Sequence, residues 1–322
     1  MLIPYYSFST KGYLKDPNDD FFINLHKIGA FLCKKNYGEV HLITDTKGRD
    51  FFKKKVNFDS ITVLKELDNI PESYRQVWSL GKILCYKHLA REKIPFLHVD
   101  YDVFLWKKLP DFIENADVFA QNLERNAVDH YKVDSAFKYC KYKNFPIKKN
   151  FLQKLLNIKN KIYPDFAYNM GIFGGQDFSF IEDYASKSLE FVFHPDNDYF
   201  WKEFKVQNPY GLEIYWSKAT IAEQWYLAKC EELFDKKITC LFNEKEANSG
   251  MWSEIDFHNN EYDLLNDKSK KKILLNKLLS NKDIYLNAED ICYKYGYTHL
   301  WGAKSSSPVQ AMVNDLAKKL GL

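Results

Sequence analysis

The sequence predicts an α/β protein whose mostly parallel sheet is flanked by helices. Apolar, strand-like runs alternate with amphipathic helical patterns through the first third of the chain. Strands that alternate with helices are joined by right-handed crossovers, which place the strands parallel in a sheet covered on both faces. The chain is large enough for such a core, because its 322 residues are 46% hydrophobic and 17% aromatic.

The amino-terminal third shows strands and helices in alternation. Leu2 to Phe8 has the pattern of a buried strand, and the polar stretch KGYLKDPNDD after it is typical of a turn. The Gly38 turn leads into a second strand, EVHLITD. Strands are expected at 2–8, 39–45, 60–65 and 95–105, and helices at 21–35, 47–55 and 73–93. Neither GxGxxG after the first strand nor GxxxxGKS/T occurs, which excludes a dinucleotide fingerprint and a P-loop.

The rest of the chain is predicted from similar patterns. Strand-like segments lie at 117–124, 166–175 (FAYNMGIFGG) and 238–242 (ITCLF), with a short strand or loop around His299. Helical patterns cover 129–160, 177–193, 211–233 and 265–281, and a last helix starts at Pro308, since proline suits a first helical turn. The sequence contains no internal repeat and no linker long enough to separate two domains.

Charge and cysteine content exclude two classes of site. The net charge is +3, and arginine occurs only at Arg49, Arg75, Arg91 and Arg125. Guanidinium groups, which bind nucleic acid through paired hydrogen bonds, are therefore scarce, and no nucleic-acid partner is expected. The six cysteines contain no CxxC pair, which suits reduced core thiols in a reducing compartment and argues against a zinc site.

The sequence predicts a cytoplasmic protein. The amino-terminal MLIPYYSFST lacks the basic n-region and the long apolar h-region of a signal peptide, and no run of about 18 apolar residues occurs. A peripheral contact with the inner face of the membrane, or with an anionic glycan, would come from the Lys-rich tracts 129–160 and 265–281. Exposed lysines on helices are more often solubilising, so both interpretations stay open.

The sharpest local pattern is IPFLHVDYDVFLW, in which an apolar strand, Pro95 to Val99, runs out into Asp100, Tyr101 and Asp102. Open α/β sheets bind ligands at the carboxyl ends of their parallel strands. On a continuing strand the two carboxylates would face the same side and repel each other, so a divalent cation is their natural partner. An aspartate pair that forms only a turn or a cap is the alternative.

An apolar strand followed by D-x-D and further apolar residues resembles the DxD signature of GT-A fold glycosyltransferases. FLHVDYDVFLW is similar to the form found in glycosyltransferase families 8 and 32. The resemblance implies a GT-A (Rossmann-like) fold with a mixed, mostly parallel sheet. It also implies a single domain over 1–322, with a nucleotide-binding half at 1–125 and an acceptor-binding half with the C-terminal tail at 126–322.

Donor-binding residues follow from the same resemblance. It implies that Asp100, Tyr101 and Asp102 contact a nucleotide-sugar donor. It also implies that a basic residue on the preceding helix, YRQVWSLGKILCYKHL, reaches that donor. Lys82 is the expected residue, with Arg75 as the second choice. An ordinary exposed helix lysine is the alternative for Lys82.

The segment YNMGIFGGQD is similar to the N-x-G segment of the family, which shapes the sugar and acceptor pocket. Asn169 offers a donor and an acceptor for sugar hydroxyls. Gly171 lacks a Cβ atom, so its backbone can approach a ligand or turn sharply. A glycine-rich β-bulge is the alternative.

The helix TIAEQWYLAKC resembles the family's acidic-plus-Gln pair at Glu223 and Gln224, with Glu in place of the usual Asp. By this resemblance Glu223 contacts the donor-sugar hydroxyls or lies beside the reacting carbon, and it would be the general base if the reaction inverts. Helical Glu is usually solvated, but the apolar neighbours 225–227 indicate a partly buried turn, where a carboxylate needs partners. Together with Asn169, this pair makes up the expected catalytic residues.

The tail YTHLWGAKS resembles the family-8 pattern H-x-x-G-x-x-K, with one residue fewer before the lysine. The resemblance implies that His299 is a third metal ligand and that Gly302 and Lys304 bind the donor, the lysine through its diphosphate. Neutral imidazole is a good ligand for a borderline cation such as Mn²⁺.

These segments together predict a metal-dependent glycosyltransferase. It would move a sugar from a nucleoside diphosphate sugar, a UDP-sugar by preference, to a glycan or lipid-linked cell-surface precursor. Mn²⁺ or Mg²⁺ held by Asp100, Asp102 and His299 would stabilise the departing diphosphate, with help from Lys82 and Lys304. The histidine-containing tail favours retention of configuration.

Two other functions stay open. The first is a catalytically inactive GT-A-like module that binds a glycan or a protein. The second is a metal-dependent nucleotidyltransferase or phosphodiesterase, which also uses aspartate pairs on strands. Turnover of a sugar nucleotide, with release of a nucleoside diphosphate, would distinguish the transferase from both.

Overall fold

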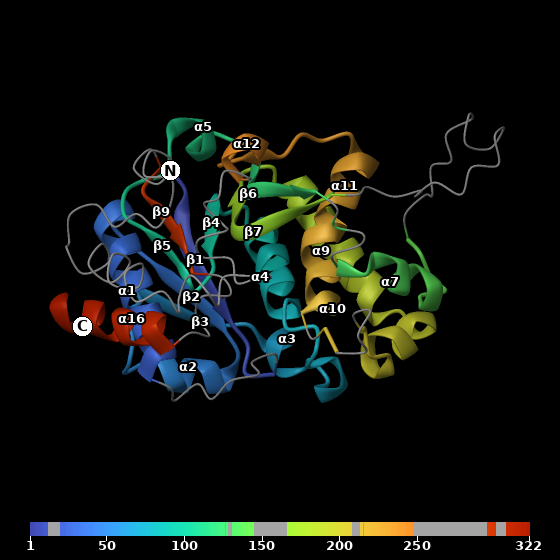
Figure 1. Cartoon of the computed structure of the whole chain (residues 1–322), viewed down its shortest axis with the longest axis horizontal. Helices are drawn as coiled ribbons and strands as arrows, with labels where there is room; N and C mark the ends of the chain where they lie inside the picture. Colours follow the sequence, from blue (N-terminus) through green and yellow to red (C-terminus); the bar gives the residue numbers. More distant parts are fainter. Residues whose placement is uncertain are drawn as a thin grey trace.

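A seven-stranded mixed sheet forms the centre of the protein (Figure 1). This computed structural model describes residues 1–11, 20–125, 127, 131–144, 166–207, 213–214, 216–247, 295–300 and 307–322. The strand order is β3-β2-β1-β4-β7-β6-β8. The strands are β1 (Ile3–Phe8), β2 (His41–Thr44), β3 (Ser60–Val63), β4 (Phe96–Val99), β6 (Val118–Arg125), β7 (Phe166–Gly175) and β8 (Thr239–Cys240).

Among these strands only β7 runs against its neighbours. It pairs antiparallel with β4 and β6, whereas β1 pairs parallel with β2 and β4, β2 with β3, and β6 with β8. The central strands are buried along almost their whole length, as strands covered on both faces must be. The expected α/β class, with a mixed, mostly parallel sheet flanked by helices, is confirmed.

Helices cover both faces of this sheet (Figure 1). The main ones are α1 (Asp20–Tyr37), α2 (Thr46–Phe52), α4 (Leu80–Arg91), α9 (Phe178–Phe193), α11 (Tyr226–Phe234) and α16 (Ser307–Lys319). Successive residues of a strand point to opposite faces. Phe96 therefore joins the core formed with α4, α9 and α11, and Leu97 joins the core formed with α1 and α2. Asp45 is the N-cap of α2, because its carboxylate accepts a hydrogen bond from the backbone N–H of Gly48.

The prediction of a single strand at 95–105 is wrong. β4 ends at Val99, the chain turns, and β5 (Val103–Leu105) pairs with β9 (Tyr297–His299) in a separate two-stranded sheet. The turn is closed by the backbone N–H of Val103, which donates to the carbonyl of Asp100 at 2.9 Å. The two aspartates of the DxD segment therefore flank a turn and do not lie on a continuing strand.

Two expected helices begin later than their sequence patterns. The helix expected at 73–93 begins at Leu80, after a 3₁₀ turn, η1 (Glu72–Tyr74). The segment between them is tied to a neighbouring helix, because the hydroxyl of Ser79 donates to the backbone carbonyl of Ala219. The helix expected at 211–233 consists of α10 (Ser217–Thr220), a π-helical turn η4 (Ile221–Trp225) and α11.

Some expectations concern residues outside the described ranges. Gly302, Lys304, Cys292 and the tract 265–281 lie outside them. The tract 129–160 is described only at 131–144, which includes α7 (Val133–Tyr139).

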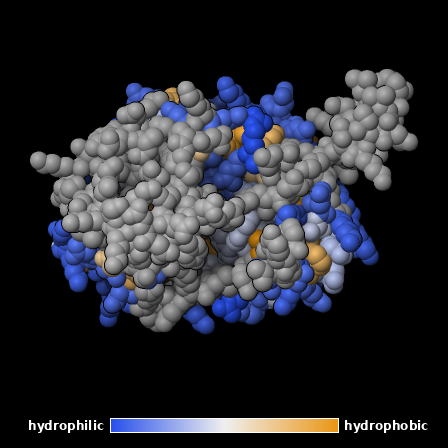
Figure 2. All heavy atoms as spheres, viewed as in Figure 1, coloured by the Kyte–Doolittle hydropathy of each residue, from blue (hydrophilic) through white to orange (hydrophobic). Residues whose placement is uncertain are grey.

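The described surface residues and cysteines have the character that the sequence predicts. In the view of Figure 2 the described surface residues are mainly hydrophilic. No described helix is both long enough and apolar enough to cross a membrane. The five described cysteines are free thiols, and Cys240 alone among them is not fully buried.

His26 on α1 is a buried histidine enclosed by aromatic rings. The ring centroids of Phe22, Phe52 and Tyr101 lie 4.3, 4.8 and 5.4 Å from its own. Its Nδ1 donates to the carbonyl of Phe22 at 2.9 Å. Burial lowers the pKa of His26 to about 4, although the Phe22 carbonyl and the charge of Asp102 oppose this shift.

The His26→Phe variant is expected to lose part of the acid sensitivity of the wild type. Between pH 6.5 and about 4 the unfolded chain binds a proton at His26 that the folded chain does not. The free energy of unfolding therefore falls as the pH falls through this window, by roughly 3 kcal/mol from this group. Denaturant unfolding of both proteins at several pH values measures the difference. An identical pH profile in the variant would contradict this assignment.

Candidate active site

The DxD segment and the C-terminal tail meet at the carboxyl end of β4. β5 and β9 pair antiparallel in a register that sets Val103 opposite His299. The backbone N–H of Leu300 donates to the carbonyl of Asp102 at 2.8 Å. One ligand atom from each of Asp100, Asp102 and His299 lies within 4.8 Å of the other two. The structure thus brings the three expected metal ligands together from distant parts of the chain.

The donor atoms of this cluster fit a divalent cation. Two carboxylates supply hard oxygen ligands, and an imidazole suits Mn²⁺ better than Mg²⁺, which prefers oxygen. Nε2 of His299 lies 3.6 Å from Oδ1 of Asp102, and its Nδ1 lies 2.9 Å from Oε1 of Gln121. Because an amide oxygen only accepts hydrogen bonds, Nδ1 carries the proton, and in the neutral ring Nε2 then has the lone pair that a metal needs.

Asp100 also favours a positively charged ligand. Burial raises its pKa to about 7; Lys82 opposes this shift, and the charges of Glu223 and Asp102 add to it. A cation bound between the carboxylates would favour their ionised forms. A cation bound at this cluster would therefore offset the electrostatic cost of ionising both carboxylates.

Lys82 lies beside this cluster as a buried residue, so its interpretation as an exposed helix lysine is wrong. Its side chain projects from α4, and the residue is 8% exposed. Its Nζ lies 2.9 Å from Oδ1 of Asp100 and 2.7 Å from Oε1 of Glu223. Burial alone would lower the pKa of Lys82, but the charges of Asp100 and Glu223 raise it. Lys82 is therefore held as a cation between two acids.

Glu223 lies on the π-helical turn η4 and is 0% exposed. The hydroxyl of Tyr86 donates to its Oε1 at 3.0 Å, in addition to the ion pair with Lys82. Burial raises the pKa of Glu223, and Lys82 and Tyr86 oppose the shift. Single π-helical turns inside α-helices occur often at functional sites. Oε1 therefore has the partners that sequence reasoning required for a buried carboxylate, whereas Oε2 has no hydrogen-bond partner among the described residues.

Asn169 and Gln224 belong to a second polar group. Nδ2 of Asn169 donates to Oε1 of Glu124 at 2.7 Å. The hydroxyl of Tyr131 contacts Glu124 and also donates to Oε1 of Gln224 at 2.7 Å. The two expected catalytic amides are thus connected through a carboxylate and a phenol that sequence reasoning did not single out.

The structure explains why position 171 holds a glycine, which the sequence did not reveal. A Cβ atom there would lie 2.2 Å from Oε1 of Gln121, 2.7 Å from Nδ1 of His299 and 2.8 Å from the hydroxyl of Tyr297. Its carbonyl accepts from the backbone N–H of Asp100 at 2.9 Å. The glycine therefore makes room for the polar groups beside the expected metal ligands.

The Gly171→Ala variant is expected to lose about 1–3 kcal/mol of stability, because the added methyl overpacks a buried cluster. Its Mn²⁺ affinity should fall as well, since His299 is one of the groups that must move. Denaturant unfolding and a Mn²⁺ titration measure the two effects. A variant with wild-type stability and wild-type affinity would show that the cluster has spare room.

The remaining expected residues are less informative. Tyr101 is partly exposed and stacks on His26 with an interplanar angle of 7°. Its contact with a donor stays a prediction. Arg75, the second choice for the basic residue, pairs instead with Glu72 at 3.6 Å.

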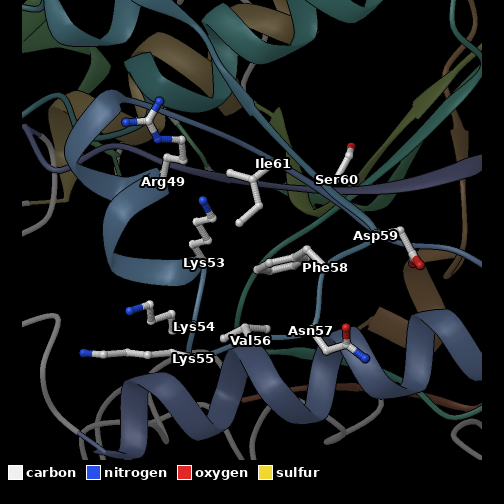
Figure 3. Close-up of a pocket in the computed structure, with 10 residues that line it drawn as sticks. All are labelled: Arg49, Lys53, Lys54, Lys55, Val56, Asn57, Phe58, Asp59, Ser60 and Ile61. Carbon is white, nitrogen blue, oxygen red and sulfur yellow. The ribbon is translucent and has the colours of Figure 1, made fainter.

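A hollow of about 630 Å³ lies apart from these residues (Figure 3). It is lined by Arg49, Lys53, Lys54, Lys55, Val56, Asn57, Phe58, Asp59, Ser60 and Ile61. These residues run from α2 to the start of β3, at the amino end of the parallel strands, whereas the DxD turn follows the carboxyl end of β4. The hollow contains none of the expected site residues and forms no part of the candidate site.

Sequence reasoning missed residues that support the expected ligands. Gln121 and Tyr86 bond directly to His299 and Glu223. A signal existed for the first, because Gln121 and Asn122 are adjacent amides inside the apolar strand VFAQNLER, where polar groups need partners. No signal existed for Tyr86, since a tyrosine on an amphipathic helix is ordinary core.

A family model described as "Family of unknown function (DUF6734)" matches residues 17–282. No curated protein matches the sequence. Among solved structures, the chain is similar to mouse xyloside xylosyltransferase 1 in its apo form. The two share 8% sequence identity with a TM-score of 0.37, over 74% of this chain and 84% of that chain.

Proposed function

This chain belongs to the family described as "Family of unknown function (DUF6734)", and we propose that it is a metal-dependent glycosyltransferase of the GT-A type. The observation that carries the proposal is the meeting of His299 with Asp100 and Asp102, whose ligand atoms lie within 4.8 Å of one another. An aspartate pair that served only as a turn would not need a histidine from a distant segment. A divalent cation would use all three as ligands.

The charged residues around the cluster suit the departure of a diphosphate. When bound, Mn²⁺ or Mg²⁺ would act as a Lewis acid on the diphosphate of the donor. Asp100, Asp102 and His299 would hold the ion. Lys82 stays protonated beside Glu223 and keeps a second positive charge at the same edge of the sheet, where negative charge grows on the leaving group.

The surroundings of Glu223 favour retention of configuration. Its Oε1 bonds to Lys82 and Tyr86, its Oε2 has no hydrogen-bond partner in the described part of the chain, and no part of the residue is exposed to solvent. Because the whole carboxylate is shut off from solvent, Glu223 is poorly placed to take a proton from an incoming acceptor hydroxyl. On a retaining route the departing phosphate oxygen takes that proton, and no protein base is required.

The donor we propose is a UDP-sugar, and the acceptor is a glycan or lipid-linked cell-surface precursor in the cytoplasm. The amides of Asn169 and Gln224 both donate and accept hydrogen bonds, which suits sugar hydroxyls. Their connection through Glu124 and Tyr131 holds them in one polar group.

Release of nucleoside diphosphate from a panel of sugar nucleotides, with and without Mn²⁺, tests this function. Release is expected with at least one donor and only when metal is present. Mn²⁺ with UDP should also raise the thermal midpoint, because a ligand of the native state stabilises it. Binding without turnover would indicate the inactive glycan- or protein-binding module. Release of nucleoside monophosphate would indicate a nucleotidyltransferase or phosphodiesterase.

A further inference from the structure

Gln121 lies where the pairing of β6 with β7 is irregular. The register of the two strands shifts between Ala120 and Asn122. Irregularities of this kind re-aim a side chain at sites of function. The fully buried amide of Gln121 meets the imidazole of His299 in the space that the missing Cβ of Gly171 leaves.

The oxygen and the nitrogen of this amide are fixed by their neighbours. Oε1 accepts from Nδ1–H of His299 at 2.9 Å and from the hydroxyl of Tyr297. Nε2 donates to Oδ1 of Asn122 at 2.8 Å. A flipped amide would place its oxygen against the oxygen of Asn122, so the three contacts agree on one orientation.

We propose that Gln121, held by Tyr297 and Asn122, is a positioning residue that fixes His299 as the Nδ1–H tautomer and directs Nε2 at the DxD carboxylates. The inference rests on the proposed function in taking these carboxylates as metal ligands. The group that accepts from the second ring nitrogen of a metal-ligating histidine sets the tautomer and the orientation of the ring. Loss of that group lowers metal affinity by about 10–100-fold.

The test compares Gln121→Leu with Gln121→Glu, using Mn²⁺ alone as the probe. A titration followed by the electron paramagnetic resonance of free Mn²⁺ gives the affinity, and nitrogen NMR of the His299 imidazole gives its tautomer. Gln121→Leu is expected to bind Mn²⁺ about 10–100-fold more weakly and to show a mixture of tautomers. Gln121→Glu keeps an oxygen that accepts from Nδ1–H but loses the bond to Asn122, so its affinity should lie between those of Gln121→Leu and the wild type.

Tyr295→Phe is the matched control. Tyr295 lies two residues before Tyr297, and its hydroxyl donates to Glu246 at 3.1 Å. The variant therefore loses a tyrosine hydroxyl bond close to His299 in the chain without touching Gln121. Wild-type Mn²⁺ affinity and the Nδ1–H tautomer are expected.

The outcomes separate this inference from the proposed function. Equal Mn²⁺ affinity and an equal tautomer in Gln121→Leu would overturn the inference and leave the metal site intact. A loss of affinity as large in Gln121→Glu as in Gln121→Leu would indicate packing alone and would also overturn it. A wild type that binds no Mn²⁺ would overturn the proposed function, while the tautomer of His299 would still decide the role of Gln121.

Discussion

The Asp102→Asn variant is expected to lose metal-dependent release of nucleoside diphosphate by about a thousandfold or more, because a bound cation contributes several kcal/mol to the departure of such a leaving group. Its metal-free thermal midpoint should stay nearly unchanged. Asp102 is 1% exposed at the turn after β4, and asparagine fills the same volume. An assay for released nucleoside diphosphate and a thermal scan measure the two quantities.

Asp111→Asn serves as the control for this variant. Asp111 lies on α5 (Asp111–Glu114) and is exposed, so the same change of charge there should alter neither quantity. Full activity in Asp102→Asn would refute the assignment of this aspartate to a metal. A large drop in the thermal midpoint would instead give the carboxylate a structural role.

The sheet and its helices were predictable wherever a segment's own pattern decides its structure. β7 has the bounds expected from FAYNMGIFGG, and α9 begins one residue after the expected position. The division of 95–105 into β4 and β5 was not predictable in this way. The second half pairs with β9, and a partner so distant in the chain leaves no trace in local periodicity.

The candidate site was also predictable only in part. The motif residues Asp100, Asp102 and His299 could be named from the sequence, and the structure places them together. The groups that hold them could not. The contact of Gln121 with His299 depends on an irregular strand pairing, and the burial of Glu223 depends on a π-helical turn. Both arise from packing between elements, which a single sequence does not display.

Lys82→Met is expected to lower the free energy of unfolding by about 3–5 kcal/mol near neutral pH, because it leaves the buried Glu223 and the partly buried Asp100 without their shared cation. Nζ of Lys82 lies within 2.9 Å of Asp100 and 2.7 Å of Glu223. The loss should shrink as the pH falls, since burial raises the pKa of both acids and a protonated carboxyl needs no cation. Lys87→Met, a partly exposed lysine on the same helix, should change stability by less than about 0.5 kcal/mol.

The double variant Lys82→Met/Glu223→Gln distinguishes the structural role of Lys82 from its role toward a donor. Glu223→Gln removes one of the two uncompensated charges, so the double variant should be more stable than Lys82→Met alone. Its release of nucleoside diphosphate should stay low, because the positive charge beside Asp100 is still missing. Simple addition of the two single losses in stability would contradict the buried ion pair. Restored release would show that the lysine serves the fold and not the leaving group.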